Sequence, residues 1–417
     1  MKSRDLYMKT LLEFKDKKVI KIVTGMRRSG KSTLLELFAE RLRADGVPPA
    51  NIIKMNFESM QYDSIVDYRA LYGEIKNKIE LSSENNVSSA KFYLIFDEIQ
   101  MISGWEKAIN SFLVDFNVDV YITGSNAFLL SSELSTLLSG RYVEIRMLPL
   151  SFKEYLHFNA FEPSVSMDTK FDYYLKYGGL PALSEFGQNQ QRINDMLEGV
   201  YSTVILKDVI QRNKIADHAM LHKLVLFLAD NIGNMTSPHT IGNSLAKEGD
   251  IDEGKRRKNP ASKTVESYIR ALENAYIFYS AKRYDIKGRQ YLKTLEKYYI
   301  VDIGLRNMLL GYRDMDRGHI LENVVYFELK RRGYDVSIGK VGEKEIDFIA
   351  VRQDDKRYYQ VTESLLDAEV RKREIAPLKD INDNYTKVVL SMDRSFINSD
   401  EGIQLQNIID FLLEDYS

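Results

Sequence analysis

Short apolar runs alternate with amphipathic patterns through the first 150 residues of the chain. The apolar runs predict β-strands at 19–24, 52–57, 92–96, 118–123 and 142–146. Between them, apolar residues recur at helical spacing, and Leu34, Phe38 and Leu42 form one such series. Apolar strands that alternate with helices are typical of a parallel sheet covered on both faces. We therefore expect an α/β fold for this region.

The remainder of the chain shows three further patterns. From about residue 151 the pattern is helical, with a sharp break at 177–181, Tyr-Gly-Gly-Leu-Pro. Residues 216–300 predict two helices, a loop, a third helix and two strands around Gly288, an order that suits a winged helix. A helix at 321–332 is followed by strands at 336–338, 345–350, 358–362 and 387–391. The last hundred residues thus predict a second α/β unit.

One segment of the first region matches a nucleotide-binding motif. Residues 25–32 have the sequence Gly-Met-Arg-Arg-Ser-Gly-Lys-Ser, which fits G-x-x-x-x-G-K-[ST] between a predicted strand and a predicted helix. In such a loop the lysine contacts the β- and γ-phosphates, the next hydroxyl is a ligand of Mg²⁺, and the helix N-terminus attracts the phosphates. We expect nucleotide contacts from Gly25, Arg28, Ser29, Gly30, Lys31, Ser32 and Thr33.

A pair of carboxylates ends the third predicted strand. Asp97 and Glu98 directly follow the apolar run 92–96. In magnesium-dependent ATPases one carboxylate here holds the metal and another polarises the attacking water. We assign Asp97, with Ser32, to the metal and Glu98 to the role of general base. An isolated Asp-Glu pair usually marks only a solvated loop, so this assignment depends on the phosphate-binding motif.

Polar residues also follow the fourth predicted strand, as Gly124-Ser125-Asn126. A side chain at this strand end could lie between the strands that carry Lys31 and Asp97, where it would sense the γ-phosphate or orient water. Ser125 and Asn126 are both candidates, and we take Asn126 as the catalytic one. The alternative is ordinary turn chemistry.

Composition narrows the possible classes of protein. The chain has 417 residues, which is too long for one core and predicts two to four domains. It has no cysteine, so disulfides and thiolate metal sites are excluded. No apolar run approaches the roughly 20 residues that span a bilayer, and the charged N-terminus is not a signal peptide. We expect a cytoplasmic protein without a membrane partner.

The net charge of −2 gives no general attraction for nucleic acid, so contact with DNA would need a local basic patch. Such residues cluster around the predicted winged helix, at 255–258 (Lys-Arg-Arg-Lys) and at Lys282, Arg283, Lys287 and Arg289. They could meet the phosphates of duplex DNA. The alternative is a solvated charge run on a domain that only packs on its neighbours.

With these features, the chain resembles a prokaryotic family of AAA+ type P-loop ATPases that join an ATPase core to a C-terminal domain of uncharacterised function. The motifs that carry the resemblance are 25–33, Phe96-Asp-Glu-Ile-Gln100, Thr123-Gly-Ser-Asn126, Leu138-Ser-Gly-Arg141, Leu148-Pro-Leu-Ser-Phe152, Gly178-Gly-Leu-Pro181, 297–302 (Lys-Tyr-Tyr-Ile-Val-Asp) and Gly304-Leu-Arg306. The resemblance implies four parts. They are a P-loop ATPase core at 1–150, a helical lid at 151–215, a winged helix at 216–305 and a small restriction-endonuclease-like α/β domain at 306–417.

Arg141 is a further catalytic candidate, because it precedes the fifth predicted strand, close to where AAA+ proteins present an arginine to a γ-phosphate. A guanidinium there would offset charge on the transferred phosphoryl group. The sequence leaves open whether it serves its own subunit or a neighbouring one. The alternative is a surface ion pair with Glu144.

The terminal domain departs from the metal site that the endonuclease-like fold implies. In that fold a helix Glu, a strand Asp and a following E-x-K sequence gather a metal. Glu322 and Asp347 match in position, but Gln360 replaces the second acid and Thr362 the lysine. Lys344 is the residue we expect to substitute for that lysine in space. We expect a degenerate domain rather than an active nuclease.

Together these features give a leading hypothesis. The protein is expected to be an ATPase that binds ATP and Mg²⁺, and its nucleotide state is expected to rearrange the winged-helix and C-terminal domains. A second hypothesis is a nucleic-acid-binding regulator in which ATP is a slow switch, and a third is an ATP-controlled, metal-dependent nuclease. Duplex DNA and further copies of the same chain, as a homo-oligomer, are the macromolecular partners that these hypotheses leave open. No motif separates ATP from GTP.

Overall fold

The computed structural model describes residues 2–83, 91–127, 138, 140–247, 261–394 and 399–415. The basic segment 255–258 and Ser139 lie outside these described residues. The chain folds into two compact units. The first contains Met1–Met147 and Asn274–Tyr276, and the second contains Leu148–Glu273 and Ile277–Ser417.

The first unit contains a five-stranded sheet in which every neighbouring pair is parallel. Its strands are β1 (Ile20–Thr24), β2 (Ile52–Asn56), β3 (Phe92–Asp97), β4 (Val118–Gly124) and β5 (Tyr142–Arg146). They lie in the order β2-β3-β4-β1-β5. The structure therefore confirms the predicted α/β fold with a parallel sheet, and each strand agrees with its predicted range to within one residue.

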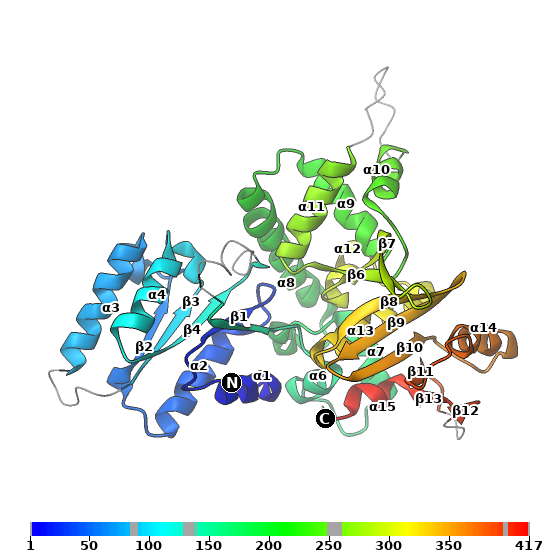
Figure 1. Ribbon diagram of the computed structural model, residues 1–417, viewed down its shortest axis with the longest axis horizontal. Helices are drawn as coiled ribbons and strands as arrows, with labels where there is room; N and C mark the ends of the chain where they lie inside the picture. Colours follow the sequence, from blue (N-terminus) through cyan, green and yellow to red (C-terminus); the bar gives the residue numbers. More distant parts are fainter. Residues whose placement is uncertain are drawn as a thin grey trace, which may run out of the picture. The chain divides into compact units, whose positions relative to one another are not determined.

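Helices cover both faces of this sheet, as Figure 1 shows. They are α1 (Asp5–Glu13), α2 (Lys31–Ala44), α3 (Tyr68–Ser83) and α4 (Trp105–Asp115). Successive side chains of a strand point to opposite faces. Ile22 therefore joins the core under α3 and α4, whereas Val23 joins the core under α1 and α2. Both faces of the strands are buried, which explains their continuous apolar runs.

The second unit begins with helices and ends with a large mixed sheet. Its helical elements are α6 (Phe152–Phe158), α7 (Met167–Tyr177), α8 (Gln190–Thr203), a π-helix (Val204–Gln211), α9 (His218–Asp230), α10 (Pro238–Lys247), α11 (Ser262–Asn274), α12 (Ile303–Leu310), α13 (Arg317–Arg331), α14 (Ala368–Lys379) and α15 (Ile408–Leu413). Helix α11 stands where we predicted the third helix of residues 216–300. Helices α9, α10 and α11 lie together beside the first two strands of the unit (Figure 1).

The sheet of the second unit has eight strands. They are β6 (Phe278–Asp285), β7 (Gln290–Ile300), β8 (Asp335–Val341), β9 (Lys344–Arg352), β10 (Asp355–Val361), β11 (Thr386–Ser391), β12 (Ser399–Asp400) and β13 (Ile403–Asn407), in the order β12-β13-β11-β10-β9-β8-β6-β7. The hairpin β6–β7 is the expected pair of strands around Gly288. It joins the later strands because Arg283–Asp285 pairs in parallel with Ile338–Lys340. One sheet thus runs across the boundary that we predicted at 305/306, and the four-part division stays a prediction.

Two of the motifs that carry the family resemblance contact each other inside the second unit. Asp302 is the N-cap of α12, where its Oδ1 accepts a hydrogen bond from Leu305 N at 3.2 Å. Its Oδ2 accepts one from Gly179 N at 2.7 Å, in the Gly178-Gly-Leu-Pro181 turn. A Cβ atom on Gly178 would lie 2.2 Å from Asp302 Oδ1 and one on Gly304 would lie 2.1 Å from Tyr177 O. The glycines of both motifs therefore permit the close approach of the two segments.

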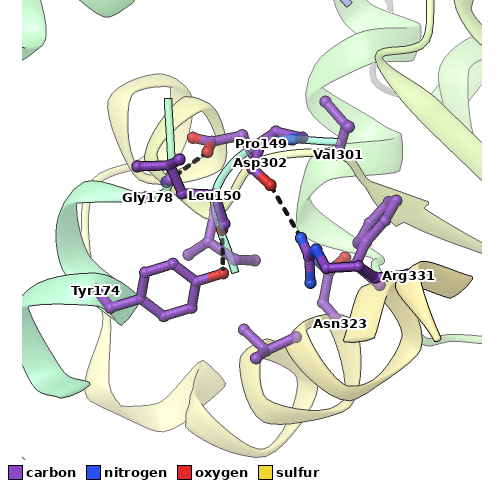
Figure 2. Close-up of a pocket in the computed structure, with 12 residues that line it drawn as sticks. Pro149, Leu150, Tyr174, Gly178, Val301, Asp302, Asn323 and Arg331 are labelled. Atoms are coloured by element: carbon purple, nitrogen blue, oxygen red, sulfur yellow. Dashed lines mark hydrogen bonds between the residues drawn. The ribbon is translucent and has the colours of Figure 1, made fainter. Parts of the chain in front are cut away.

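Figure 2 shows this junction, where Tyr174 donates to Leu150 O and Arg331 to Pro149 O, each at 2.9 Å. The cavity between them has a volume of about 20 Å³. That is room for about one water molecule. The junction is therefore a packing element rather than a ligand pocket.

Candidate functional site

The loop after β1 has the strained backbone that its glycines predict. Gly25 has φ +136°, and a Cβ atom on it would lie 2.2 Å from Met147 O. Gly30 has φ +97° and is the N-cap of α2. Arg28 also has positive φ, at +67°, which few residues other than glycine adopt. The loop therefore turns sharply at three positions before the helix begins.

Lys31 is buried and curls back onto this loop. Its Nζ donates to the carbonyl oxygens of Gly25 and Met26, both at 2.9 Å. Ser32 and Thr33 lie exposed in the first turn of α2. Because the N-cap is a glycine, it has no side chain to bond the first amides of the helix. A buried ammonium and a helix N-terminus thus lie at the carboxyl edge of the sheet, where the arrangement suits an anion.

The ends of β3 and β4 bring Asp97 and Glu98 into a hydrogen-bonded group. The hydroxyl of Thr123 donates to Asp97 Oδ1 and accepts from Glu98 N, the latter at 3.0 Å. Glu98 has φ +53°, so the chain turns at this residue and its side chain is not part of the strand pattern. Both carboxylates are buried, with residue exposures of 9% for Asp97 and 6% for Glu98.

The surroundings of Glu98 favour the protonated form of its carboxyl more than bulk water would. Burial raises the pKa of its carboxyl above the ordinary value, although the positive charges of Lys31 and Arg27 oppose that rise. Gln100 donates to Glu98 Oε2, and Ser125 donates to the same atom at 3.3 Å. A raised pKa moves a carboxylate toward the range in which general bases work.

The strand order accounts for the positions of Ser125 and Asn126. Because β4 lies between β3 and β1, its carboxyl end falls between the strand with Asp97 and the strand before Lys31, as we predicted. Both residues are buried, Ser125 at 0% and Asn126 at 1% exposure. Ser125 contacts the candidate base directly. The structure thus gives Ser125 a specific contact, while the catalytic role of Asn126 stays a prediction.

Arg141 lies apart from this group. Its carbonyl oxygen accepts from Ile20 N at 2.8 Å, at the start of β1. The phosphate-binding loop leaves the other end of β1, so Arg141 and the loop lie at opposite edges of the same sheet. Glu144 forms its ion pair with Arg146, at 3.0 Å, rather than with Arg141 as in our alternative. Arg141 is exposed.

Sequence reasoning missed several residues that complete the site. Thr123 and Gln100 stand in two of the motifs that carry the family resemblance, but neither was given a role, and the structure makes them partners of Asp97 and Glu98. Arg4, the N-cap residue of α1, donates to Ser29 O at 3.2 Å, and no motif marks this segment. Arg146 pairs along β5 with Thr24, the residue before the loop.

The other predicted site residues belong to the second unit. Lys282, Lys287 and Arg289 are exposed along the β6–β7 hairpin. Glu322 and Asp347 both contact the ammonium of Lys297. Lys344 instead forms an exposed ion pair with Asp380 at 2.9 Å, so it does not supply the missing cation. The hydroxyl of Thr362 donates to Ser364 O, at 3.5 Å.

Two properties of the described residues bear on the class of protein. No group of three or more Asp, Glu or His side chains there is arranged to hold a metal ion by itself. Within the same ranges, none of the helices combines the length and the apolar character that crossing a bilayer requires.

Comparisons with known proteins agree with the geometry of the loop. The family described as "AAA domain" matches residues 17–156, and a domain of unknown function (DUF8612) matches residues 168–316. An uncharacterised protein of Haemophilus influenzae is 40% identical over 415 residues, covering 99% of each chain. An uncharacterised protein of Methanocaldococcus jannaschii is 27% identical, covering 94% of this chain and 87% of its own.

A solved structure shows the same fold at low sequence identity. The Walker-type ATPase PABY2304 of Pyrococcus abyssi is 16% identical, with a TM-score of 0.52, over 74% of this chain and 96% of that one. The AAA match covers the five-stranded sheet and its loop. The chain therefore belongs to the same family as the Haemophilus influenzae protein, and its N-terminal part, residues 17–156, matches the AAA domain family.

Proposed function

We propose that this protein is a Mg²⁺-dependent ATPase. The observation that carries the proposal is the meeting of Lys31, Asp97 and Glu98 at the carboxyl edge of one parallel sheet, where ligands bind in open α/β folds. Thr123 bonds the carboxylate of Asp97 and the backbone amide of Glu98, and Ser125 donates to the carboxylate of Glu98.

Each residue has a role that its surroundings support. Lys31 leaves the carbonyl oxygens of Gly25 and Met26 to bind phosphate, and the amides of the loop and of the first turn of α2 complete the anion site. The exposed hydroxyl of Ser32 and the carboxylate of Asp97 are hard oxygen donors of the kind Mg²⁺ requires. Mg²⁺, when bound, offsets the negative charge of the phosphates. Glu98 accepts the proton of the attacking water.

The nucleotide state is proposed to rearrange the second unit. ATP hydrolysis does work only when it is coupled to a change elsewhere, and the proposal places that change within this chain. The largest remaining part carries the eight-stranded sheet and the DUF8612 match. We therefore place the output of the ATPase cycle there.

Two substitutions test the ATPase proposal. Lys31→Ala should abolish nucleotide binding, because the loop loses its only buried ammonium. Glu98→Gln should retain binding but stop turnover, because an amide cannot accept the proton of water. Binding is measured by titration with a fluorescent ATP analogue and turnover by phosphate release. Normal turnover in the Glu98→Gln protein would contradict the role of Glu98 as general base. Retained nucleotide binding in the Lys31→Ala protein would contradict the proposed nucleotide site.

An ATP-switched nucleic-acid-binding regulator is the second candidate. The observation that favours it is the row of exposed cationic side chains on the β6–β7 hairpin, Lys282, Lys287 and Arg289. Contacts with phosphates release counterions, so binding should fall steeply with salt. The test is the ATPase rate with and without duplex DNA across a salt series. Stimulation that salt suppresses supports this candidate, and a rate indifferent to DNA contradicts it.

A further inference from the structure

The second unit buries a group of charged side chains that the proposed ATPase does not use. Lys297 lies on β7, Glu322 on α13, and Glu345 and Asp347 on β9. Lys297 Nζ lies 2.8 Å from Glu322 Oε1, 2.6 Å from Glu345 Oε1 and 3.8 Å from Asp347 Oδ1. The side chain of Lys297 is only 4% exposed. Three carboxylates from a helix and a strand thus surround one buried cation.

The carboxylates are held in place by further hydrogen bonds. Tyr299 donates its hydroxyl to Glu322 Oε1 at 2.7 Å, two residues along β7 from Lys297. Val361 N donates to Asp347 Oδ2 at 2.8 Å. Glu322 and Asp347 therefore have fixed orientations, with the ammonium between them. Such a group is organised around its cation rather than formed by chance on a surface.

The charges of the group depend on one another. Burial alone would lower the pKa of Lys297, but Glu322, Asp347 and Glu345 hold that pKa above its ordinary value. Burial raises the pKa of Asp347 well above the usual range, and the negative charge of Glu322 adds to that effect. Without a cation, these carboxylates could not all remain ionised in the interior.

The site consists of oxygen ligands, which suit a hard cation. Carboxylate oxygens are the ligands that Mg²⁺ and Mn²⁺ bind. Here the three carboxylates contact an ammonium that belongs to the chain, and with that ammonium between them they are not spaced to hold a metal ion themselves. A divalent ion would first have to displace a buried, fully charged lysine.

We propose that the Lys297 ammonium is a tethered cation that replaces a divalent metal in this carboxylate site and keeps the site closed to Mg²⁺ and Mn²⁺. The proposal is independent of the ATPase function. It also contradicts the third hypothesis from the sequence, because a metal-dependent nuclease would need this position for its metal.

The test is Mn²⁺ binding by the nucleotide-free, full-length protein, followed by electron paramagnetic resonance. The wild type should show no Mn²⁺ uptake that depends on Asp347. Lys297→Met removes the charge and keeps a side chain of similar length, and it should take up about one Mn²⁺ per chain. Adding Asp347→Asn to that variant should abolish the uptake. Adding Asp97→Asn instead should leave the uptake unchanged, because Asp97 belongs to the nucleotide site.

Two further variants are matched controls. Lys344→Met removes an exposed lysine of the same domain and should behave as the wild type. Lys297→Arg keeps a cation and should also bind no Mn²⁺. If Lys297→Met folds only when Mn²⁺ is present, the metal has replaced the ammonium and the proposal stands. A folded Lys297→Met protein without Mn²⁺ uptake, or one that stays unfolded with and without Mn²⁺, overturns the proposal.

Discussion

Thr123 connects Asp97 to Glu98 at the end of β3 through a single hydroxyl. That hydroxyl donates to Asp97 and accepts from the backbone amide of Glu98. The contact with Asp97 orients the proposed metal ligand, and the contact with the amide fixes the turn on which the proposed base stands. Thr123 is therefore a positioning residue, because it acts on both groups without touching phosphate itself.

Replacing this hydroxyl should separate binding from turnover. We expect Thr123→Val to bind nucleotide as the wild type does, because Lys31 is unchanged. Turnover should fall about 10- to 100-fold, as for other residues that orient a metal ligand. The Mg²⁺ concentration that gives half the maximal rate should also rise. Both are measured by phosphate release, and Thr123→Ser, which keeps the hydroxyl, should restore them. A Thr123→Val enzyme with an unaltered Mg²⁺ dependence would contradict this role.

The residues found from the sequence differ from those found only in the structure. Lys31 and Ser32 belong to a motif whose spacing along the chain fixes their chemistry. Thr123 contacts Asp97, 26 residues away, and Lys297 contacts Asp347, 50 residues away. Nothing local marks either contact, because each depends on which strands become neighbours. Lys344, which we expected to substitute for the missing lysine in space, was therefore the wrong lysine, because it pairs with Asp380.

At the scale of elements, Asp302 ties the start of α12 to the turn after α7. Its two oxygens accept from Leu305 N and Gly179 N, which come from two separate motifs. Asn307, one turn further along α12, donates to the carbonyl oxygens of Leu175 and Lys176 at 2.9 Å. The carboxylate thus lies at a junction of helices within the second unit, and its charge state affects the stability of that junction.

Because of Asp302, the free energy of unfolding should fall as pH rises. Burial raises the pKa of Asp302 to about 6, against an ordinary value of 3.8. The folded chain therefore keeps a proton that the unfolded chain loses, so stability should decline between about pH 4 and pH 6 and level off above. At about 1.4 kcal/mol per pKa unit, the loss is about 3 kcal/mol.

Asp302→Asn should lack this decline, so the difference in unfolding free energy between the two proteins should change across that window. Calorimetry can follow the second unit, because the single tryptophan, Trp105, reports only on the first by fluorescence. A difference that stays constant from pH 4 to pH 6 would show that Asp302 does not titrate there.

The elements themselves were predictable to very different degrees. The strands of the first unit are apolar on both faces and separated by helices, so periodicity alone located them. The eight-stranded sheet was not predictable as one sheet, because β6 pairs with β8 over only three residues, more than 50 positions apart. The short strands β12 and β13 and the helices α14 and α15 were missed, since their apolar patterns are brief.

At the scale of the whole molecule, Arg141 bears on whether the protein works as a single chain. It lies at the amino edge of the sheet, beside the first residue of β1, whereas the phosphate-binding loop leaves the last residue. A five-residue strand separates the two, a length of about 16 Å at about 3.3 Å per residue. An arginine side chain does not span that distance. If Arg141 contacts a γ-phosphate, the nucleotide must belong to a neighbouring copy.

Mixing two inactive variants tests that arrangement. Arg141→Ala should bind ATP but lose turnover, and Lys31→Ala should bind no ATP but still supply Arg141. In a random mixture of equal amounts, about a quarter of the interfaces combine an intact nucleotide site with an intact arginine, so about a quarter of the wild-type rate should return.

A mixture of Lys31→Ala with Glu98→Gln is the control, because both losses fall on the same site and no interface can be complete. It should stay inactive at every ratio. Phosphate release at several protein concentrations, with the mass in solution measured alongside, gives both results. Recovery that follows association would make Arg141 a residue donated between copies. Normal turnover by Arg141→Ala alone, or no recovery in mixtures that do associate, would show that hydrolysis does not depend on an arginine from a second chain.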